Sequence, residues 1–303
     1  MTIIEEIQQL KQQKDAVILA HYYVSPQVQQ VADYVGDSFY LSQVATQLKQ
    51  RVLLFCGVAF MGESAKILNP QKTVLMPDLQ ADCPMAHMAT VEAICEMRQK
   101  YKDLAVVCYI NSTAQLKEHA DVCVTSSNAV KIVKSLPNQN ILFIPDQNLA
   151  RYVAAQVPEK NFIHLNGFCP VHQKMKKSEV EHQKQQHPNA KILAHPECTA
   201  EILSLADYVG STSGMIDYAT QDSCTEFIIC TEQGIDYELR MKNPQKTFYY
   251  PQTTPICPDM KRNTLEKILH ALKTGEGEVF VSAEQREKAK KPLEKMLELA
   301  AIR

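Results

Sequence analysis

One pattern is repeated three times along this chain of 303 residues. Each copy has an apolar strand with a polar end, an amphipathic helix, the dipeptide Ala-Asp and a second short strand. The copies are VILAHYYVSPQVQQVADYVGDS at 17–38, AVVCYINSTAQLKEHADVCVTS at 105–126 and KILAHPECTAEILSLADYVGST at 191–212. A further strand, helix and strand follow each copy, and the turn before the last strand is NPQKT at 69–73, PEKNF at 158–162 and NPQKT at 243–247. The chain is therefore three tandem units of about 87 residues.

Alternating strands and helices predict parallel sheets that helices cover on both faces. The expected fold class is α/β, with three homologous three-layer αβα domains around a pseudo-threefold axis. The expected repeats are 1–84, 85–170 and 171–258, and the helices in 259–303 are expected to pack back on the first repeat. Pro292 is expected to kink or divide the last helix. We favour a ring over a linear stack, because the carboxyl ends of the strands in such units bear the ligand-facing groups and can share one site.

Composition and charge exclude two classes of partner. The net charge is -2 and the pI is near 6.5, which gives no electrostatic footprint for nucleic acid. No apolar run approaches the ~20 residues that cross a bilayer, and MTIIEEIQQLKQQK at the N-terminus indicates an acidic amphipathic helix rather than a signal peptide. We expect a cytoplasmic protein. In a reducing compartment its ten cysteines are core thiols or metal ligands rather than disulfides.

Three cysteines differ from the other seven. Cys83, Cys169 and Cys257 close the three units, lie 86 and 88 residues apart and each precede a proline. The composition predicts about half a Cys-Pro pair by chance, so three at equivalent positions indicate one shared site. Three thiolates leave zinc one ligand short of its usual four, whereas a [4Fe–4S] cluster held by three cysteines keeps one iron open as a Lewis acid. Two alternatives stay open: a zinc site completed by His172, and turn cysteines without a metal.

Polar residues also recur at the strand ends. The equivalent sets are His21, Tyr109 and His195; Tyr23, Asn111 and Glu197; and Ser38, Ser126 and Thr212. We expect a shared pocket, with the hydroxyls as helix N-caps next to N–H groups that favour a phosphate or carboxylate. Glu197 and Tyr23 are the candidate proton carriers, as base and acid. Lys261 is the candidate cation for an anionic substrate, while Glu232 and Asp146 are expected to hold the interface between repeats.

The chain resembles the quinolinate synthase family along essentially its whole length. The resemblance is carried by LAHYY, GDS, MPDLQADC, CYIN, TSSNAV, NGFCPVH, HPEC, GSTSGM, TEQGI and CPDMKRNTL. It implies a [4Fe–4S] cluster on the three Cys-Pro cysteines. It also implies condensation of iminoaspartate with dihydroxyacetone phosphate to quinolinate, with loss of phosphate and water, in NAD biosynthesis. A transient contact with L-aspartate oxidase, the source of the imine, follows from the resemblance alone.

The resemblance also implies roles for individual residues. It places His21, Ser38, Tyr109, Asn111, Ser126, His195, Glu197 and Thr212 in the substrate site, and we expect Ser211 and Lys261 beside them. The expected catalytic residues are Tyr23, Glu197, His21, His195 and Tyr109, while His172 is expected either to support the groups that contact the cofactor or to have a structural role. Two other functions stay open: another iron–sulfur hydro-lyase, and a zinc-stabilised protein that binds a small phosphorylated anion.

Overall fold

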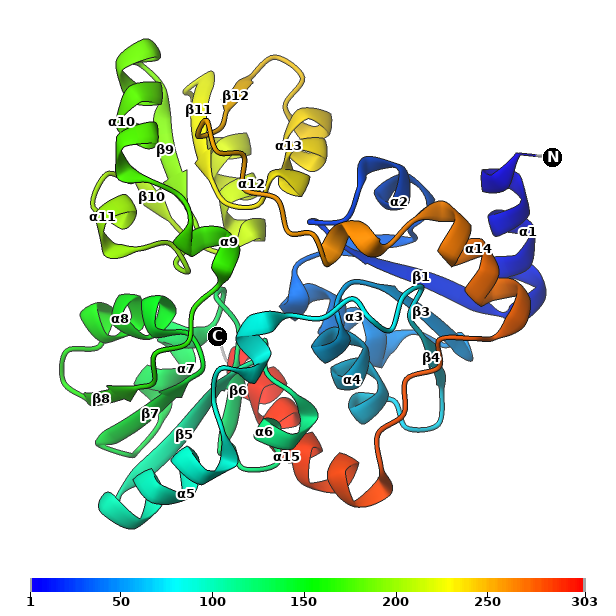
Figure 1. Cartoon of the computed structure of the whole chain (residues 1–303), viewed down its shortest axis with the longest axis horizontal. Coiled ribbons are helices and arrows are strands. Elements are labelled where there is room, and N and C mark those ends of the chain that lie inside the picture. Colours follow the sequence, from blue (N-terminus) through cyan, green and yellow to red (C-terminus); the bar gives the residue numbers. More distant parts are fainter. Residues whose placement is uncertain (1, 302–303) are drawn as a thin grey trace.

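The computed structural model describes residues 2–301 and shows three lobes around a common centre (Figure 1). The first lobe contains α1 (Ile3–Lys14), β1 (Ala16–His21), α2 (Pro26–Val31), β2 (Tyr34–Gly36), α3 (Ser38–Gln47), β3 (Val52–Cys56), α4 (Ala59–Leu68) and β4 (Thr73–Leu75). The second contains α5 (Val91–Lys100), β5 (Leu104–Tyr109), α6 (Ala114–Lys117), β6 (Val122–Val124), α7 (Ala129–Ser135), β7 (Asn140–Ile144), α8 (Gln147–Gln156) and β8 (Asn161–His164). The third contains α9 (Pro170–Gln173), α10 (Lys177–Gln186), β9 (Lys191–Ala194), α11 (Ala200–Leu203), β10 (Tyr208–Val209), α12 (Thr212–Gln221), β11 (Glu226–Cys230), α13 (Asp236–Lys242) and β12 (Thr247–Tyr249). Two helices follow: α14 (Leu265–Thr274) and α15 (Ala283–Ala301).

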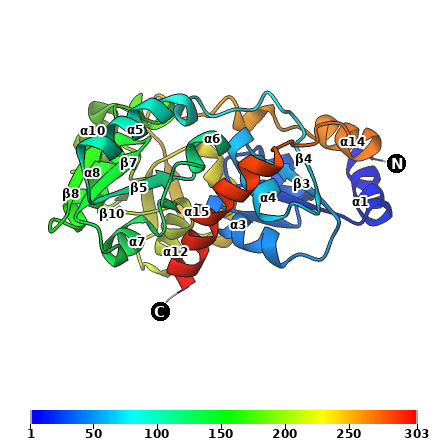
Figure 2. The same ribbon diagram turned by 90° about the horizontal axis from the view of Figure 1, so that it is seen from below.

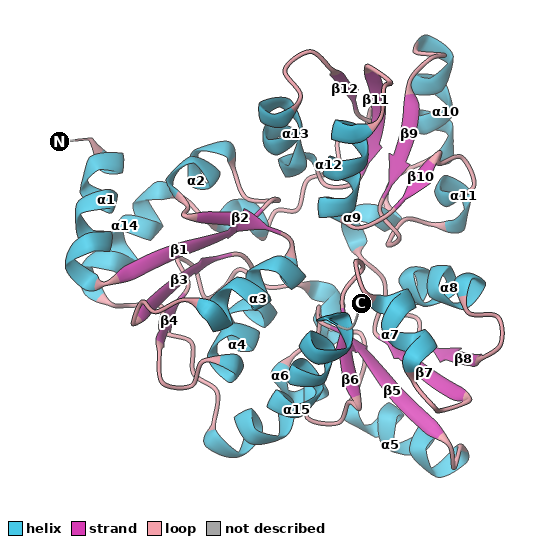
Figure 3. Cartoon of the chain, turned by 180° about the vertical axis from the view of Figure 1, so that it is seen from behind, coloured by secondary structure: helices cyan, strands magenta, loops and turns pink. Residues whose placement is uncertain are grey.

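The three sheets have the same topology. Their strand orders are β2-β1-β3-β4, β6-β5-β7-β8 and β10-β9-β11-β12, and every pair of neighbouring strands is parallel. Helices lie on both faces of each sheet (Figure 3). All residues of β1 and β5 are buried, as expected for central parallel strands between two helical layers. The expected fold class is confirmed.

The aspartate of each Ala-Asp dipeptide connects the chain before the second strand of its repeat to the first strand. Its carboxylate accepts a hydrogen bond from a backbone N–H of the first strand, and its own N–H donates to the carbonyl of that same residue. The pairs, with the carboxylate distances, are Asp33 and Ile18 (2.8 Å), Asp121 and Val106 (2.7 Å), and Asp207 and Ile192 (2.7 Å). The conformation of this turn is therefore the same in all three lobes.

The lysine of the repeated NPQKT turn binds the end of a helix. In each repeat its ammonium donates to two carbonyls at a helix C-terminus, at 2.5–3.2 Å. The donors and acceptors are Lys72 to Ala45 and Leu48, Lys160 to Leu136 and Asn138, and Lys246 to Ala219 and Asp222. The last carbonyls of a helix lack intrahelical partners and favour a cation. Helix C-capping therefore explains why the lysine recurs.

The two C-terminal helices occupy different places. α14 lies against α1 at the outer edge of the first lobe (Figure 1), where Lys273 pairs with Glu6 at 2.6 Å. α15 instead contacts α6, β6 and α7 of the second lobe as well as α4 of the first. Figure 2 shows it crossing beneath a flat molecule. The expectation that 259–303 packs on the first repeat therefore describes α14 but only one side of α15, which bridges two lobes.

Pro292 does not divide the last helix, because α15 runs without a break from Ala283 to Ala301. Pro292 removes one backbone hydrogen bond, but it is buried, and its neighbours Ala289, Leu293 and Met296 are fully buried as well. Packing against two lobes keeps the helix continuous. None of the helices in residues 2–301 has the length and apolar character that crossing a bilayer requires.

Candidate active site

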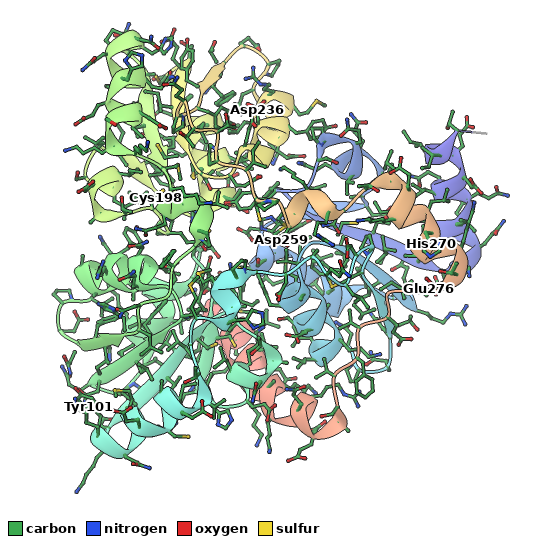
Figure 4. The ribbon with its side chains drawn as sticks, viewed as in Figure 1. Tyr101, Cys198, Asp236, Asp259, His270 and Glu276 are labelled. Carbon is green, nitrogen blue, oxygen red and sulfur yellow. The ribbon has the colours of Figure 1, made fainter. Side chains whose placement is uncertain are left out.

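One pocket, about 340 Å³ in volume, lies where the three lobes meet. Most of the residues that the repeat pattern singled out line it: His21, Tyr23, Ser38, Cys83, Tyr109, Asn111, Ser126, Cys169, His195, Glu197, Thr212 and Cys257. Asp259, another lining residue, lies near the centre of Figure 4, whereas Tyr101, His270 and Glu276 lie on the outer rim. Ser211 and Lys261 are not part of the lining.

Each lobe contributes one cysteine to the pocket. Cys83, Cys169 and Cys257 are partly buried, and the proline after Cys83 and Cys169 begins a short helical turn. Burial raises the pKa of all three thiols, that of Cys257 to about 11, and the carboxylate of Glu197 raises those of Cys83 and Cys169 further. Without a metal they stay protonated. Metal binding would deprotonate them, so the site suits a strongly bound cationic group.

The other seven cysteines do not reach the pocket lining in the described part of the chain. Five of them are buried, as core thiols are expected to be: Cys56, Cys108, Cys123, Cys198 and Cys230. Cys95 is exposed and Cys224 is partly buried. The thiols at the centre are thus the ones that precede proline.

His21 and His195 have the same geometry in two lobes. The Nδ1 atom of His21 accepts the N–H of Tyr23 at 3.1 Å, and that of His195 accepts the N–H of Glu197 at 3.3 Å. Each ring therefore has its proton on Nε2, and His195 Nε2 donates to the Ser126 hydroxyl at 3.1 Å. Burial lowers the pKa of His21 to about 3 and that of His195 to about 4. Both are neutral N–H donors at pH 7.

Glu197 is a buried carboxylate with a partner on each oxygen. Its Oε1 accepts the hydroxyl of Tyr109 at 2.7 Å, and its Oε2 accepts Nδ1–H of His172 at 2.9 Å. Burial alone raises the pKa of Glu197, but the neighbouring His195 and His172 and these two hydrogen bonds lower it to about 2 overall. Glu197 is therefore ionised at neutral pH, as a general base must be.

Two threonines of the third lobe hold Tyr23 at the pocket. Its hydroxyl lies 2.9 Å from Oγ1 of Thr212 and 2.7 Å from Oγ1 of Thr231. Burial and the charge of Glu197 raise the pKa of Tyr23 well above its usual value. The phenol keeps its proton at neutral pH and can serve as an acid.

In the first and third lobes the helix caps lie one residue earlier than expected. Asp37 caps α3 through the N–H of Tyr40, and Ser211 caps α12 through the N–H of Gly214. The expectation that Ser38, Ser126 and Thr212 are N-caps is wrong. Ser38 and Thr212 are each the first residue inside their helix, and Asn128 rather than Ser126 precedes α7. Their hydroxyls are therefore free of capping and line the pocket.

Lys261 connects two lobes beside the pocket. Its ammonium lies 2.8 Å from Oε1 of Glu232 and donates to the carbonyl of Tyr23 at 2.5 Å. The same Glu232 accepts the N–H of Cys257 at 3.0 Å and that of Gly234 at 2.6 Å. This pair positions the loop of the third cysteine.

Asp146 occupies the place equivalent to Glu232 in the second lobe. Its Oδ1 caps α8 through the N–H of Leu149 at 2.7 Å, whereas its Oδ2 is buried without a hydrogen-bond partner among residues 2–301. Burial and the nearby charge of Glu197 raise the pKa of Asp146 well above its usual value. Burial in this place therefore favours the protonated form of Asp146 over the carboxylate.

Repeat comparison alone missed two polar residues near the pocket. Asp37 lines it and accepts the hydroxyl of Ser213 across the lobes at 2.7 Å. Thr231 is fully buried behind Tyr23. The position of both residues directly after a strand could have indicated them. Thr231, however, is equivalent to Gly57 and Pro145, which are not polar, so comparison of the repeats did not single it out.

Residues 5–298 match the model of the family described as quinolinate synthetase A protein. The chain belongs to this family. Its assignment from sequence motifs is confirmed, and the chain is an enzyme. The quinolinate synthetase A match covers all three lobes and the bridging helix α15 as far as residue 298.

Curated relatives agree over nearly the whole chain. The quinolinate synthase of Fusobacterium nucleatum is 56% identical over 296 residues, which cover 98% of this chain and 99% of the relative. That of Clostridioides difficile is 51% identical over 97% of both chains. That of Caldicellulosiruptor saccharolyticus is 51% identical over 98% of both. This chain therefore has the same extent as these members of the quinolinate synthetase A family.

Proposed function

We propose that this chain is a quinolinate synthase, which condenses iminoaspartate with dihydroxyacetone phosphate and releases phosphate and water. The observation that carries the proposal is the convergence on one pocket of a Cys-Pro cysteine from each lobe with two neutral histidines, Tyr23 and Glu197. Relatives of that name, matched over nearly their full length, support it.

Cys83, Cys169 and Cys257 would hold a [4Fe–4S] cluster. The donor set fits such a cluster, because three thiols line one pocket and come from three separate lobes. When bound, a cluster with three cysteine ligands supplies one open iron as a Lewis acid. The carboxylate of Glu232 holds the N–H of Cys257, which fixes the loop of one ligand.

The protein's own groups would bind the anionic reactants. The Nε2–H groups of His21 and His195 are neutral donors for carboxylate or phosphate oxygens. The N-terminal ends of α3 and α12 lie at the pocket through Ser38 and Thr212, and helix N-termini favour anions. Burial of these donors excludes water and strengthens their hydrogen bonds.

Proton transfer would be divided between two side chains that line the pocket. Ionised Glu197 takes a proton from carbon or nitrogen during condensation and ring closure, and Tyr109, which already donates to it, holds its orientation. Protonated Tyr23 supplies a proton to a leaving hydroxyl. We also propose that Asn111 and Ser126 contact the reactants, since both line the same pocket.

The setting of the reaction is part of the proposal. Both reactants are small molecules, and iminoaspartate hydrolyses in water, so we propose a transient contact with L-aspartate oxidase in the cytoplasm. A pocket at the junction of three lobes protects such an imine once it is bound. Neither a nucleic acid nor a membrane has a role in this proposal.

A second candidate rests on one group of side chains. Ligand atoms of Cys169, His172 and Glu197 lie within 4.8 Å of one another, a spacing that can hold a single metal ion. A zinc ion there would make the chain a small-anion binding protein. Metal analysis separates this candidate from the quinolinate synthase. A third possibility, another iron–sulfur hydro-lyase, predicts a cluster without quinolinate formation.

The first prediction tests this function. Protein purified without oxygen is expected to contain about four iron and four sulfide per chain and to form quinolinate from dihydroxyacetone phosphate and iminoaspartate generated by L-aspartate oxidase. Cys83→Ser, Cys169→Ser and Cys257→Ser should each lose most of the iron and the activity. Cys95→Ser is the control, because Cys95 is exposed.

Three outcomes would contradict the proposal. Colourless protein with one zinc per chain would support the binding protein. A complete cluster without quinolinate would support another hydro-lyase. Iron lost equally in Cys95→Ser would mean that the assay reports general fragility of the protein rather than ligation.

A further inference from the structure

Two loops carry the first and the third cysteine of the pocket. The Cys83 loop consists of residues 76–83, which follow β4, and the Cys257 loop consists of residues 257–264, which precede α14. The second and third lobes separate these loops in the sequence, so the local course of the chain does not set the distance between them. Contacts between side chains have to do so.

Asp78 of the Cys83 loop binds two cations from the other end of the chain. Its Oδ2 atom accepts Nε–H of Arg262 at 3.0 Å and the ammonium of Lys267 at 2.7 Å. Arg262 belongs to the Cys257 loop, and Lys267 lies in the first turn of α14 directly after it. The side chain of Asp78 is 10% exposed. One nearly buried carboxylate therefore joins the two cysteine loops.

Further hydrogen bonds fix the geometry of this group. Oδ1 of Asp78 accepts the N–H of Gln80 at 2.8 Å, and Oε1 of Gln80 accepts Nη2–H of Arg262 at 2.7 Å. Lys267 also donates to the carbonyl of Arg262 at 3.1 Å. Both oxygens of the carboxylate thus have partners, and each loop is held by more than one bond.

The repeat itself does not require a carboxylate at this position. The strands β4, β8 and β12 pair in the same way with their neighbours, which makes their first residues equivalent. Five residues further on, the three copies have Asp78, Asn166 and Gln252. The two counterparts are neutral amides. The charge is present only in the copy whose loop meets the segment that returns from the third lobe.

We propose that Asp78 is a positioning residue for Cys83 and Cys257, because its ion pairs with Arg262 and Lys267 hold the two cysteine loops together. The inference rests on the proposed function, in which these cysteines bind a cluster. Asp78 lies outside the pocket lining, so its effect on the cluster is indirect. Groups that fix metal ligands in this way commonly contribute about 10- to 100-fold to metal affinity.

The test measures how fast the cluster is lost from Asp78→Asn, which keeps the size of the side chain and removes its charge. Protein purified without oxygen is mixed anaerobically with the iron chelator bathophenanthroline disulfonate, and iron release is followed over time. Asp78→Asn is expected to release iron about 10-fold faster than wild type.

A matched control separates ligand positioning from stability of the fold. Glu6→Gln removes an ion pair between α1 and Lys273, in the last turn of the same helix α14. It should release iron at the wild-type rate. Without the cluster, the thermal midpoints of Asp78→Asn and Glu6→Gln should agree within about 3 °C, because Arg262 and Lys267 are 38% and 43% exposed and regain water.

A double variant tests whether Asp78 acts through its cations. Lys267→Met removes one of the two partners and should accelerate iron release by about threefold. Adding Lys267→Met to Asp78→Asn should accelerate it little further, because the ion pair is already broken.

Three results would overturn the inference. Iron release at the wild-type rate in Asp78→Asn would show that the carboxylate does not position the ligands. Equal acceleration in Glu6→Gln, or a thermal midpoint that falls in parallel with the acceleration, would indicate a general loss of stability. Effects that multiply in the double variant would show that Asp78 does not act through Lys267.

Failure of the proposed function gives a different result. Wild-type protein with its full iron content that forms no quinolinate would overturn the proposed reaction, while the comparison of iron release would still decide the role of Asp78. Wild-type protein without iron would overturn both proposals.

Discussion

At the scale of single residues, the two strand-end histidines show how burial sets chemistry. His21 and His195 each accept a hydrogen bond from the backbone N–H two residues further along the chain, and both are nearly inaccessible to water. Burial disfavours the charged imidazolium, so both remain neutral far below the usual pKa of histidine. The pocket thereby gains two N–H donors without adding positive charge next to the cysteines.

The lowered pKa values predict a stability loss in acid. The folded pKa is about 3 for His21 and about 4 for His195, below the ordinary 6.5, so unfolding takes up protons as the pH falls below about 6.5. The stability that depends on the neutral rings is complete above pH 6.5 and is lost as the pH falls towards 4. Each histidine contributes up to about 1.4 kcal/mol per pH unit.

This loss of stability in acid can be measured through the thermal midpoint between pH 7 and 4.5. The wild type is compared with the double variant His21→Gln, His195→Gln. The midpoint of the double variant should fall less steeply with acid. His182→Gln is the control, because His182 is exposed. Parallel slopes in wild type and double variant would show that these rings do not cause the acid sensitivity.

The repeat pattern predicted which residues face the site. It predicted less well which partner each of their side chains contacts. Polar residues at equivalent strand ends were found because parallel strands place their carboxyl ends together. Lys261 was expected to meet the substrate, and the repeat gave no sign that it also pairs with Glu232. Such pairings depend on contacts between lobes, which a comparison of one repeat with another does not contain.

At the scale of elements, the repeated lysine caps the C-terminal end of a helix from a turn that lies far from that helix in the sequence. α3 ends at Leu48 in extended backbone without a glycine, and Lys72 from the turn before β4 satisfies its carbonyls. Burial lowers the pKa of Lys72, yet its hydrogen bonds to two carbonyls compensate for the lost hydration. Helix end and strand start are thus joined in every lobe.

Lys72→Met is therefore expected to destabilise the protein by about 1–3 kcal/mol, because two carbonyls lose their donor. Unfolding in denaturant, followed by far-ultraviolet circular dichroism, measures the change. Lys242→Met is the matched control: its ammonium lies 3.6 Å from Glu238 on the surface of α13, and a change within about 0.5 kcal/mol is expected. Similar losses in both variants would contradict the capping role.

Element boundaries were harder to predict than element order. The order of strands and helices follows from the apolar pattern and was found for each repeat. The exact N-caps were displaced by one residue, because Asp37 and Ser211 compete with Ser38 and Thr212 for the same role. The continuity of α15 through Pro292 depends on packing against two lobes, and no local signal reports that packing.

At the scale of the whole molecule, side chains at the pocket also hold the lobes together. Tyr109 of the second lobe donates to Glu197 of the third, and Lys261 joins Glu232 of the third to the carbonyl of Tyr23 in the first. Opening the interface would therefore disrupt the site. Three lobes around an axis followed from the repeat, but the position of α15 did not, because that segment has no copy in the repeats.

The pair of Lys261 and Glu232 gives the last prediction. Glu232 is 1% exposed and Lys261 is 30% exposed, so Lys261→Met leaves a nearly buried carboxylate without its cation. We expect a loss of about 2–4 kcal/mol in the free energy of unfolding. Adding Glu232→Gln removes the charge, so the double variant should be more stable than Lys261→Met. Denaturant unfolding of the two single variants and the double variant measures the coupling, and additive losses would contradict it.

The pocket draws its lining from residues as far apart in the chain as His21 and Met260. During synthesis on a ribosome, the walls cannot be complete until almost the entire polypeptide has emerged. Any cofactor that requires all three cysteines must therefore be inserted after translation has nearly finished, into a chain whose first two lobes have already had time to fold. A prematurely terminated product that lacks the third lobe cannot assemble the centre, however well the remaining lobes fold.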